Sequence, residues 1–459
     1  MFALDQVWRA AGFSAAALDH VALTGSEPAL PSSFAIGTAA QASLAAAALA
    51  AAEVGHARNG LRQRVAIDMR HAALECAARF AINGNTPELW DKLAGLYRCG
   101  DGWLRLHTNF AHHRDGVLRL LGLPIGPDTD RSRVAAALGH WRALDFEQTA
   151  ADAGLVVAAL RGFDAWDRHP QRAAVAAQPL VAIDRIGDAA PLDWPSLRRD
   201  ARPLTGLRVL ELTRILAGPV GGRTLAAYGA DVMLVNGPHL PNIEAIADTS
   251  RGKLSAVADL REPAGRDALR SLVRDAHVFI EGYRPGGIDA LGYGPAALAA
   301  LRPGIVSVSL SAYGSAGPWA DRRGFDSLVQ SATGFNTAEA EAAGVDTPKA
   351  LPVQLLDMAS GFLIAFGAEA ALLRQQSEGG SWQVRVSLAR TAQWLRELGR
   401  IEDGFLAAPP DFAGLMETTA SGYGELTATR HAAVFSHTPA GWARPSMPPG
   451  THPPAWPAL

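Results

Sequence analysis

Two aspartates occupy positions where side-chain chemistry is plausible: Asp326, in RRGFD, and Asp357, in LPVQLLDMASGF. Asp357 opens an apolar helical run, where an aspartate commonly serves as a helix N-cap and accepts backbone N–H bonds. The same helix-end donors would hold a carboxylate ionised and aimed, so capping is compatible with a chemical role. Asp326 follows Arg322 and Arg323. It is either an exposed helix-start acid or a second carboxylate that orients a ligand or handles a proton.

The glycines and serines give weaker indications of function. Gly218, Gly221 and Gly222 follow a predicted strand and open a predicted helix. Their spacing is not G-x-G-x-x-G, and no acidic residue ends the second strand, which disfavours a nicotinamide-dependent oxidoreductase. Ser33 and Ser311 lack the G-x-S-x-G setting of a serine hydrolase.

A local histidine cluster contains His107, His112, His113 and Asp115, in the stretch HTNFAHHRDG. Adjacent His112 and His113 would point differently on any regular element, and the chain has no H-E-x-x-H pattern. We therefore expect a structural or surface role for the cluster and no metal site.

The elements that must position these residues alternate between strands and helices from Leu207 onward. The segments LRVLEL, ADVMLV, HVFIEG and IVSVSLS are mostly apolar, as strands of a parallel sheet are, and a helix from Gly218 to Tyr228 follows the first. This alternation predicts an α/β fold with a doubly wound parallel sheet. LYRCGDGWLRLHTNF, much earlier, predicts a hairpin.

One unit occurs twice along the chain. An Ala-rich helix, a turn, the strand QRVAID and a second helix recur later around the strand WQVRVSL. Pairing Val65 with Val384 places Thr38 opposite Asp357, and the first copy then has no carboxylate at that position. Any chemistry of this unit is therefore expected in the second copy.

Composition limits the class of protein. The 459 residues exceed one ordinary core, and 48% hydrophobic with 19% charged residues are typical of a soluble globular protein. A net charge of -3 gives no basic field for nucleic acid. Two cysteines, Cys76 and Cys99, exclude a disulfide framework, and the N-terminus does not look like a signal peptide. We expect a cytoplasmic protein without a membrane span, since the run Ala39 to Ala52 is only weakly hydrophobic.

Several longer stretches carry a family resemblance. LTGLRVLELTRILAGPVGGRTLAAYGADVMLVN, VFIEGYRPGGIDALGYG, VSLSAYGSAGPWADRRGFDSLVQSATG and LPVQLLDMASGF follow one another between Leu204 and Arg390. In this order they resemble the family III CoA-transferases, of the formyl-CoA transferase and carnitine CoA-transferase type. The resemblance implies a Rossmann-like sheet with a smaller α+β domain.

The halves of this fold look rearranged in the chain. We divide it into a leader (1–34), a region resembling the family's C-terminal half with the small domain (35–200), the Rossmann-like CoA-transferase region (204–400) and a Pro/Gly-rich extension (401–459). The family typically forms interlocked dimers, so a homodimer is expected. Whether one chain mimics the interlocked dimer is left open.

The resemblance implies that Asp357 is the acyl-accepting nucleophile, with Asp326 as its supporting acid. CoA would be the cosubstrate, CoA would pass between an acyl-CoA thioester and a carboxylic acid, and no metal would take part. Related racemases carry a histidine where this chain has Phe325, which lowers an acyl-CoA racemase or isomerase to an alternative. A non-catalytic CoA-fold binding protein is a second alternative.

The resemblance also suggests a CoA pocket. We expect it to include Arg214, Leu216, Ala217, Arg261, Tyr283, Arg284 and Arg323. The chain departs from the family at positions that usually hold a lysine, a glutamate, an asparagine or an arginine. These departures lie at Leu234, Asn236, Gly237, Gly282 and Ala290, and they put CoA affinity in question.

Overall fold

The computed structural model describes residues 1–457 and centres on a seven-stranded sheet. In spatial order its strands are β10 (Leu254–Val257), β9 (Asp231–Asn236), β8 (Arg208–Leu212), β11 (Val278–Glu281), β12 (Val306–Ser311), β13 (Ser381–Ser387) and β7 (Ala182–Gly187). All neighbours are parallel except β7, which runs antiparallel to β13. Numbered along the chain, the parallel strands lie in the order 3-2-1-4-5-6 of a doubly wound dinucleotide-binding sheet. The predicted fold class is confirmed.

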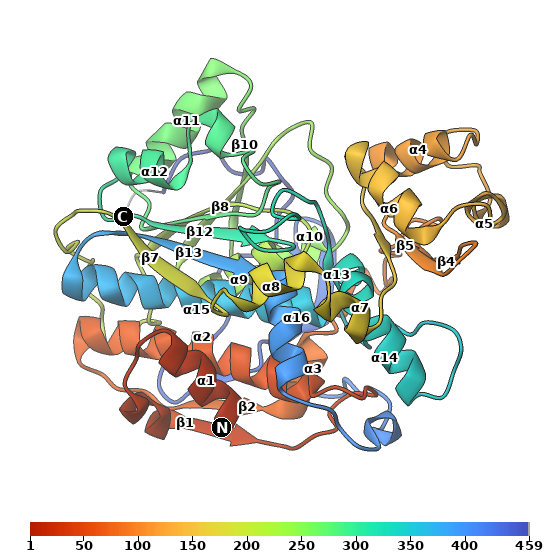
Figure 1. Ribbon diagram of the computed structural model, residues 1–459. Coiled ribbons are helices and arrows are strands. Elements are labelled where there is room, and N and C mark those ends of the chain that lie inside the picture. The colour runs from red at the N-terminus through yellow and green to blue at the C-terminus, as the bar shows by residue number, and fades with distance from the viewer. Residues whose placement is uncertain (458–459) are drawn as a thin grey trace.

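Helices cover both faces of this sheet, which is why its strands are apolar throughout (Figure 1). One face packs against α9 (Ala217–Ala227) and α15 (Leu355–Glu378), and the other packs against α11 (Pro263–Arg274) and α12 (Pro295–Leu301). By length and composition α15 is long and apolar enough to cross a membrane, but here it is buried inside the fold.

The two copies of the repeated unit lie against each other. Helix α2 (Ile36–Asn59) packs along α15, and both helices have 24 residues. Strand β2 (Val65–Asp68) and α3 (Met69–Glu75) follow α2 in the way that β13 and α16 (Leu388–Glu397) follow α15. Beneath α2, β2 pairs with β1 (Val21–Thr24) and β16 (Ala433–Phe435), with α1 (Phe2–Ala10) beside them.

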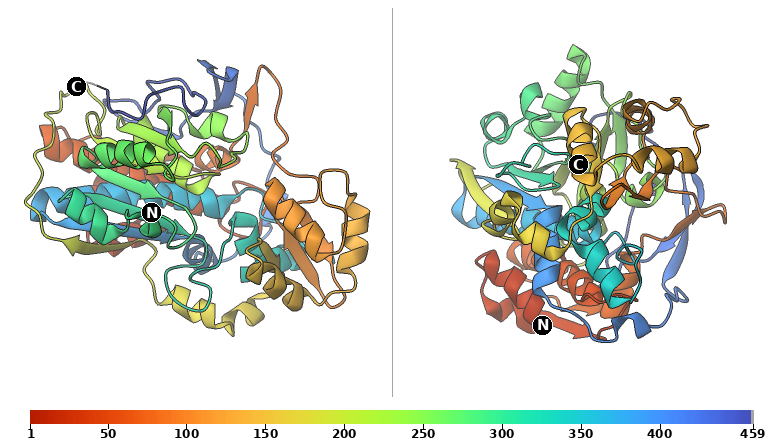
Figure 2. Two further views of the ribbon diagram at one scale, coloured as in Figure 1. Left: turned by 90° about the horizontal axis from the view of Figure 1, so that it is seen from above. Right: turned by 45° about the vertical axis from the view of Figure 1, so that its right-hand side comes forward.

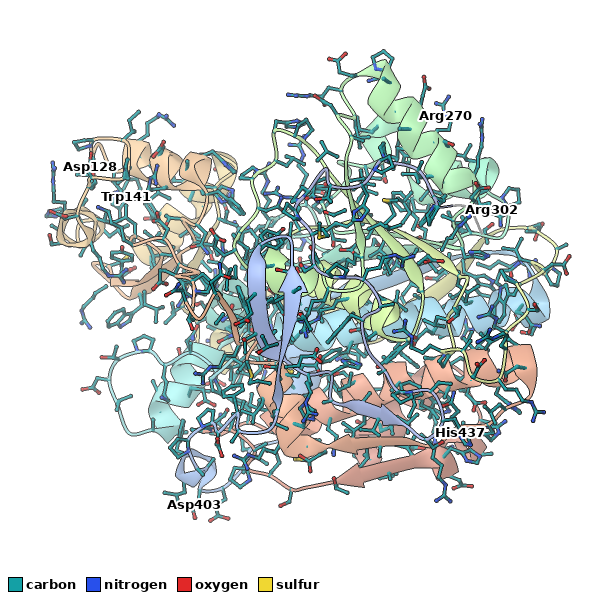
Figure 3. The ribbon with its side chains drawn as sticks, turned by 180° about the vertical axis from the view of Figure 1, so that it is seen from behind. Asp128, Trp141, Arg270, Arg302, Asp403 and His437 are labelled. Atoms are coloured by element: carbon teal, nitrogen blue, oxygen red, sulfur yellow. The ribbon has the colours of Figure 1, made fainter. Side chains whose placement is uncertain are left out.

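A small α+β unit projects beside the main body (Figure 2). Its antiparallel sheet consists of β4 (Gly95–Arg98), β5 (Trp103–Leu106) and β6 (Val157–Ala159), and the first two form the predicted hairpin. Its helices are α4 (Ala111–Leu120), α5 (Arg131–Leu138) and α6 (Ala143–Asp152), which share an apolar core with the sheet. Seen from behind, Asp128 and Trp141 mark this unit on the side opposite Arg270 of α11 (Figure 3).

Short helices occupy several connections between the strands, and two of them lead from the small unit to β7. They are α7 (Phe163–Asp167) and α8 (Pro170–Ala176) before β7, α10 (Ile246–Thr249) before β10, and α13 (Asp326–Thr333) and α14 (Phe335–Ala342) after β12. Helix α13 contacts both β5 and β6. The small unit is therefore fixed next to the segment that carries Asp326.

The C-terminal segment is more ordered than its Pro/Gly-rich sequence suggested. Strands β14 (Met416–Ser421) and β15 (Gly424–Thr429) form a hairpin that pairs with β3 (Phe80–Ile82), a contact that the sequence did not predict. The segment TRHAAVFS contains a further strand, β16. The last residues wrap over the large sheet, where His452 N–H donates to Ser255 O and the Trp456 indole donates to Leu272 O.

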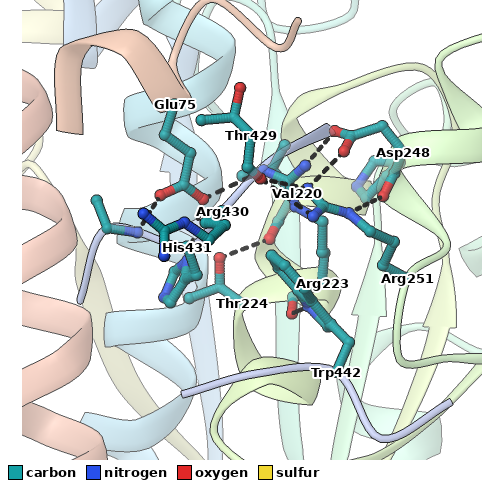
Figure 4. A network of polar contacts seen from close by, with 12 residues as sticks. Glu75, Val220, Arg223, Thr224, Asp248, Arg251, Thr429, Arg430, His431 and Trp442 are labelled. Atoms are coloured by element: carbon teal, nitrogen blue, oxygen red, sulfur yellow. Dashed lines mark hydrogen bonds and ion pairs between the residues drawn. The ribbon is translucent and has the colours of Figure 1, made fainter. Parts of the chain in front are cut away.

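A buried polar network ties this segment to both halves (Figure 4). Arg223 and Arg251 both pair with Asp248. Glu75 accepts from the backbone N–H of Ala432 at 2.8 Å and contacts His431 Nδ1 at 2.9 Å. Burial favours protonated Glu75, but the neighbouring His431 and Arg223 lower its pKa to about 2. The network therefore needs an ionised Glu75 to hold the tail in place.

Candidate active site

One cavity of about 750 Å³ opens where the carboxyl ends of β8, β9, β11 and β12 meet. Strand order reverses between β8 and β11, and ligands of open α/β sheets bind at such a switch point. The small unit closes one side with Phe110, His112, His113 and Val156. The volume lies within the range of small-molecule sites.

The structure brings nearly all predicted site residues to this cavity. Its lining includes Arg214, Leu216, Ala217, Arg261, Tyr283, Arg284, Arg323 and Asp357. Asp326 lies behind the wall, fully buried at the start of α13. The possibility that Asp326 is an exposed acid is therefore wrong.

Asp357 is not the N-cap that its sequence position suggested. It is the third residue of α15, the N-cap position belongs to Gln354, and no side chain caps this helix end. Its own backbone N–H donates to Asp326 Oδ2 at 3.0 Å. The carboxyl group of Asp357 makes no hydrogen bond within the described residues and is left to the cavity.

The two buried carboxyl groups resist ionisation. Burial raises the pKa of Asp357 well above its ordinary value, and the nearby charge of Asp326 raises it further. Burial also raises the pKa of Asp326 to about 6, opposed by hydrogen bonds from the Asp357 N–H and from Gln330. The expectation that helix-end donors would keep Asp357 ionised is wrong, because those donors do not reach its carboxylate.

The first copy of the repeat has a related contact. Thr38, the residue paired with Asp357, donates its backbone N–H to Glu27 Oε1 at 2.6 Å. A carboxylate therefore receives the same helix-end N–H in both copies, but Thr38 offers no carboxylate of its own. This agrees with the expectation that chemistry is confined to the second copy.

Phe325 joins the carboxylate pair to the small unit. It precedes Asp326, and its ring stacks on His107 with centroids 3.9 Å apart and planes 14° apart. Phe110 and His113 also lie against this group, at centroid distances from Phe325 of 6.5 and 6.4 Å. The histidine cluster is therefore buried beside the site, and the expectation of a surface role is wrong for His107 and His113. The described residues contain no group of three or more potential ligands that could hold a metal ion.

Two arginines that pair with no carboxylate among the described residues line the cavity. Arg214 hydrogen-bonds to Pro241 O and lies over Phe110, and its buried Nε has no partner. Arg323 donates to Gly154 O at 3.1 Å and lies near Arg284. Neither Arg214 nor Arg323 pairs with a carboxylate among the described residues, so both can receive an anion. Arg261 differs, because it pairs with Asp259 at 2.6 Å and is mostly exposed.

The positions that depart from the family pattern surround the same space. Asn236, Gly237, Gly282 and Ala290 line the cavity, and Leu234 is buried within β9. Asn236 is only 2% exposed, and its Nδ2 has no hydrogen-bond partner within residues 1–457. A buried donor without an acceptor is costly, so Asn236 Nδ2 is a donor that a ligand in the cavity could satisfy.

The loop that follows β8 is strained. Ile215 has a φ of 76°, in the left-handed region that β-branched residues rarely adopt. Behind this loop Lys253 pairs with Glu211 Oε2 at 2.8 Å, and both side chains are fully buried. A Cβ at Gly222 would collide with the Glu211 carboxylate. The glycines after β8 therefore allow α9 to pack over this ion pair, a role that their sequence spacing did not reveal.

Comparison with known proteins agrees with this fold. The profile of CoA-transferase family III matches residues 204–402. The chain is 30% identical over 371 residues to an acyl-CoA transferase of Gibberella moniliformis, a match that covers 71% of this chain and 64% of the relative. It is 28% identical over 331 residues to acetyl-coenzyme A transferase nodX of Hypoxylon pulicicidum, covering 68% and 56%.

A bacterial relative matches over a shorter stretch. The succinate–glutarate CoA-transferase of Agrobacterium fabrum is 35% identical over 206 residues, which covers 40% of this chain and 51% of the relative. The chain thus spans between about half and two thirds of the length of these three relatives. Residues 204–402 thus match CoA-transferase family III, and the resemblance seen in the sequence is confirmed over this part of the chain.

Proposed function

We propose that this protein moves CoA between an acyl-CoA thioester and a carboxylic acid, with Asp357 as the group that accepts the acyl unit. The observation that carries the proposal is the position of Asp357, whose carboxyl group lines the cavity without a hydrogen-bond partner of its own. A carboxylate placed in this way can attack a carbonyl carbon as a nucleophile. The match to the family supports the same reaction class.

The reaction divides into acyl transfers whose bonds and charges balance. In its ionised form, Asp357 attacks the thioester carbon through one carboxylate oxygen. The C–O bond forms, the C–S bond breaks, and CoA leaves as the thiolate. The thiolate attacks the Asp357 acyl carbon of the mixed anhydride, which gives an aspartyl–CoA thioester and releases the donor acid.

The second half of the reaction repeats these steps with the acceptor acid. The acceptor carboxylate attacks the aspartyl thioester, forming a new anhydride and freeing the thiolate. The thiolate then attacks the acceptor carbonyl, and Asp357 returns as a carboxylate. Because CoA is held on Asp357 as a thioester between the two acids, nucleophilic catalysis replaces one difficult exchange with easier steps.

The cavity lining suits CoA as the cosubstrate. Arg214, Arg284 and Arg323 are cations placed to pair with phosphate groups, and Tyr283 offers an aromatic face. The free Nδ2 of Asn236 offers a further donor at the end of β9. These groups are the ones that would bind CoA in place of the residues that the family usually has in this region.

The identities of the acids are open to direct test. The names of the relatives point to acetyl, succinyl and glutaryl groups as the first donors to try. A cytoplasmic homodimer remains part of the proposal, to be examined by sedimentation and localisation.

The test is an exchange assay between labelled carboxylic acids and a panel of acyl-CoAs. We expect label to enter the CoA pool with parallel-line (ping-pong) kinetics, and Asp357→Asn to abolish it. The exposed Asp321→Asn is the matched control and should exchange normally. CoA binding without exchange for any pair would favour a non-catalytic binding protein. Exchange of hydrogen beside the carbonyl would favour a racemase.

A further inference from the structure

His113 lies in the first turn of α4, in the small unit, yet it lines the cavity together with Asp357. Its side chain is buried, at 5% exposure, and its Nδ1 has no hydrogen-bond partner within the described residues. Among the described residues, no hydrogen bond to the imidazole ring accounts for a polar side chain at this buried position. A buried polar group of this kind usually marks a ligand or a catalytic role.

Aromatic neighbours fix the position of the His113 ring. Phe110 packs edge-on at a centroid distance of 5.6 Å, and His112 lies at 4.1 Å. Phe325 lies at 6.4 Å with its plane at 65°. Phe325 immediately precedes Asp326 in the chain, and the Asp326 carboxylate accepts a hydrogen bond from the backbone N–H of Asp357. The ring is therefore held rigidly on the same wall as the carboxylate pair.

The charged surroundings keep this imidazole neutral. Burial, together with the nearby His112, Arg323 and Arg214, lowers the pKa of His113 to about 3. A neutral imidazole has one N–H donor and one acceptor nitrogen. Burying an acceptor without a hydrogen bond costs less free energy than burying an N–H without one. Because the buried Nδ1 has no partner, we place the proton on Nε2, which is then available to a ligand in the cavity.

We propose that His113 is a catalytic residue whose Nε2–H donates a hydrogen bond to the carbonyl oxygen of the bound thioester. The inference rests on the proposed function and adds the group that receives the developing charge. When Asp357 attacks the carbonyl carbon, the C=O electron pair moves to oxygen, and His113 stabilises that oxyanion without transferring its proton. The electron pair on the oxyanion then re-forms the C=O bond as the C–S bond breaks and CoA leaves.

The substitutions separate this role from a structural one. His113→Phe suits an aromatic environment but lacks the donor, whereas His113→Gln retains a donor. Removing one oxyanion donor typically lowers kcat by about 10² to 10³-fold. We expect that loss in His113→Phe with little change in KM, and partial recovery in His113→Gln. The exposed His140→Gln is the matched control in the same unit and should behave as wild type.

The decisive measurement is the carbonyl stretch of ¹³C-labelled acetyl-CoA bound to Asp357→Asn, in which attack is blocked. We expect a shift to lower wavenumber that disappears when His113→Phe is added and returns with His113→Gln. An unchanged stretch in the His113→Phe double variant would overturn the proposal, as would loss of α-hydrogen exchange in that variant, which would make His113 a base. Because the background cannot react, the outcome does not depend on whether Asp357 is the nucleophile.

Discussion

Replacing Asp326 by asparagine should destabilise the protein in acid and stabilise it above neutral pH. Asp326 is fully buried, and its two oxygens accept separate bonds from the Asp357 N–H and the Gln330 amide. Asparagine offers one acceptor oxygen, so one of these bonds is lost. Gln330 cannot simply flip to compensate, because its carbonyl oxygen already accepts from Leu351 N–H at 3.0 Å.

The two opposing contributions can be estimated from the structure. Burial raises the pKa of Asp326 from 3.8 to about 6. A folded-state pKa above the unfolded value means that stability is full below about pH 4 and is lost as pH rises through about 6. The pKa difference of about 2.2, at about 1.4 kcal/mol for each pKa unit, corresponds to about 3 kcal/mol lost above that range. The missing hydrogen bond costs about 1 kcal/mol at any pH.

Asp326→Asn should therefore be less stable than wild type by about 1 kcal/mol at pH 4 and more stable by about 2 kcal/mol at pH 8. Urea unfolding at both pH values measures this difference, with exposed Asp321→Asn as the control. Losing the Asp326 charge also lowers the pKa of Asp357, so acylation should reach half its maximal rate at a lower pH. A stability difference that is the same at pH 4 and pH 8 would refute this reasoning.

Three further changes test other parts of the account. Lys253→Met leaves the buried Glu211 carboxyl group without its cation, so the free energy of unfolding should fall by about 3 to 5 kcal/mol. Most of this loss should be regained in Glu211→Leu/Lys253→Met. Equal losses in both variants would contradict the ion-pair assignment. Glu369 is buried, its two carboxyl oxygens have no hydrogen-bond partner among the described residues, and burial raises its pKa well above the ordinary value. Glu369→Met should therefore raise the free energy of unfolding by about 1 to 3 kcal/mol, and this gain should grow with pH. A lower free energy of unfolding in urea would show that Glu369 has a stabilising partner. Arg323→Ala should raise KM for acyl-CoA roughly tenfold and leave kcat unchanged. The control, Arg199→Ala at an exposed position, should change neither constant. A fall in kcat without a change in KM would show that Arg323 does not bind CoA.

Local sequence patterns predicted most of the large sheet and the position of the cavity. Alternating apolar strands and helices are short-range signals, and the residues that end consecutive parallel strands meet at one edge. Strand β10 (Leu254–Val257) and the β14–β15 hairpin were not predicted, because LSAV, METTAS and GELTAT mix small and polar residues and contain no continuous apolar run.

The electrostatics of the site depended on contacts that sequence patterns do not contain. Asp357 stands near a helix start in the sequence, but its pKa is set by burial and by Asp326. His113 meets Phe325 across 212 positions of chain, and its Nδ1 is unpartnered only in the folded structure. The adjacent histidines in HTNFAHHRDG were the available signal, and they were assigned a structural or surface role.

The most direct test of the central claim is mass spectrometry of the protein after incubation with acyl-CoAs and hydroxylamine. The account predicts a hydroxamate on the peptide that contains Asp357, absent from Asp357→Ala and present in Asp321→Asn. Acyl exchange that proceeds without any adduct at Asp357, or that survives in Asp357→Ala, would contradict the account.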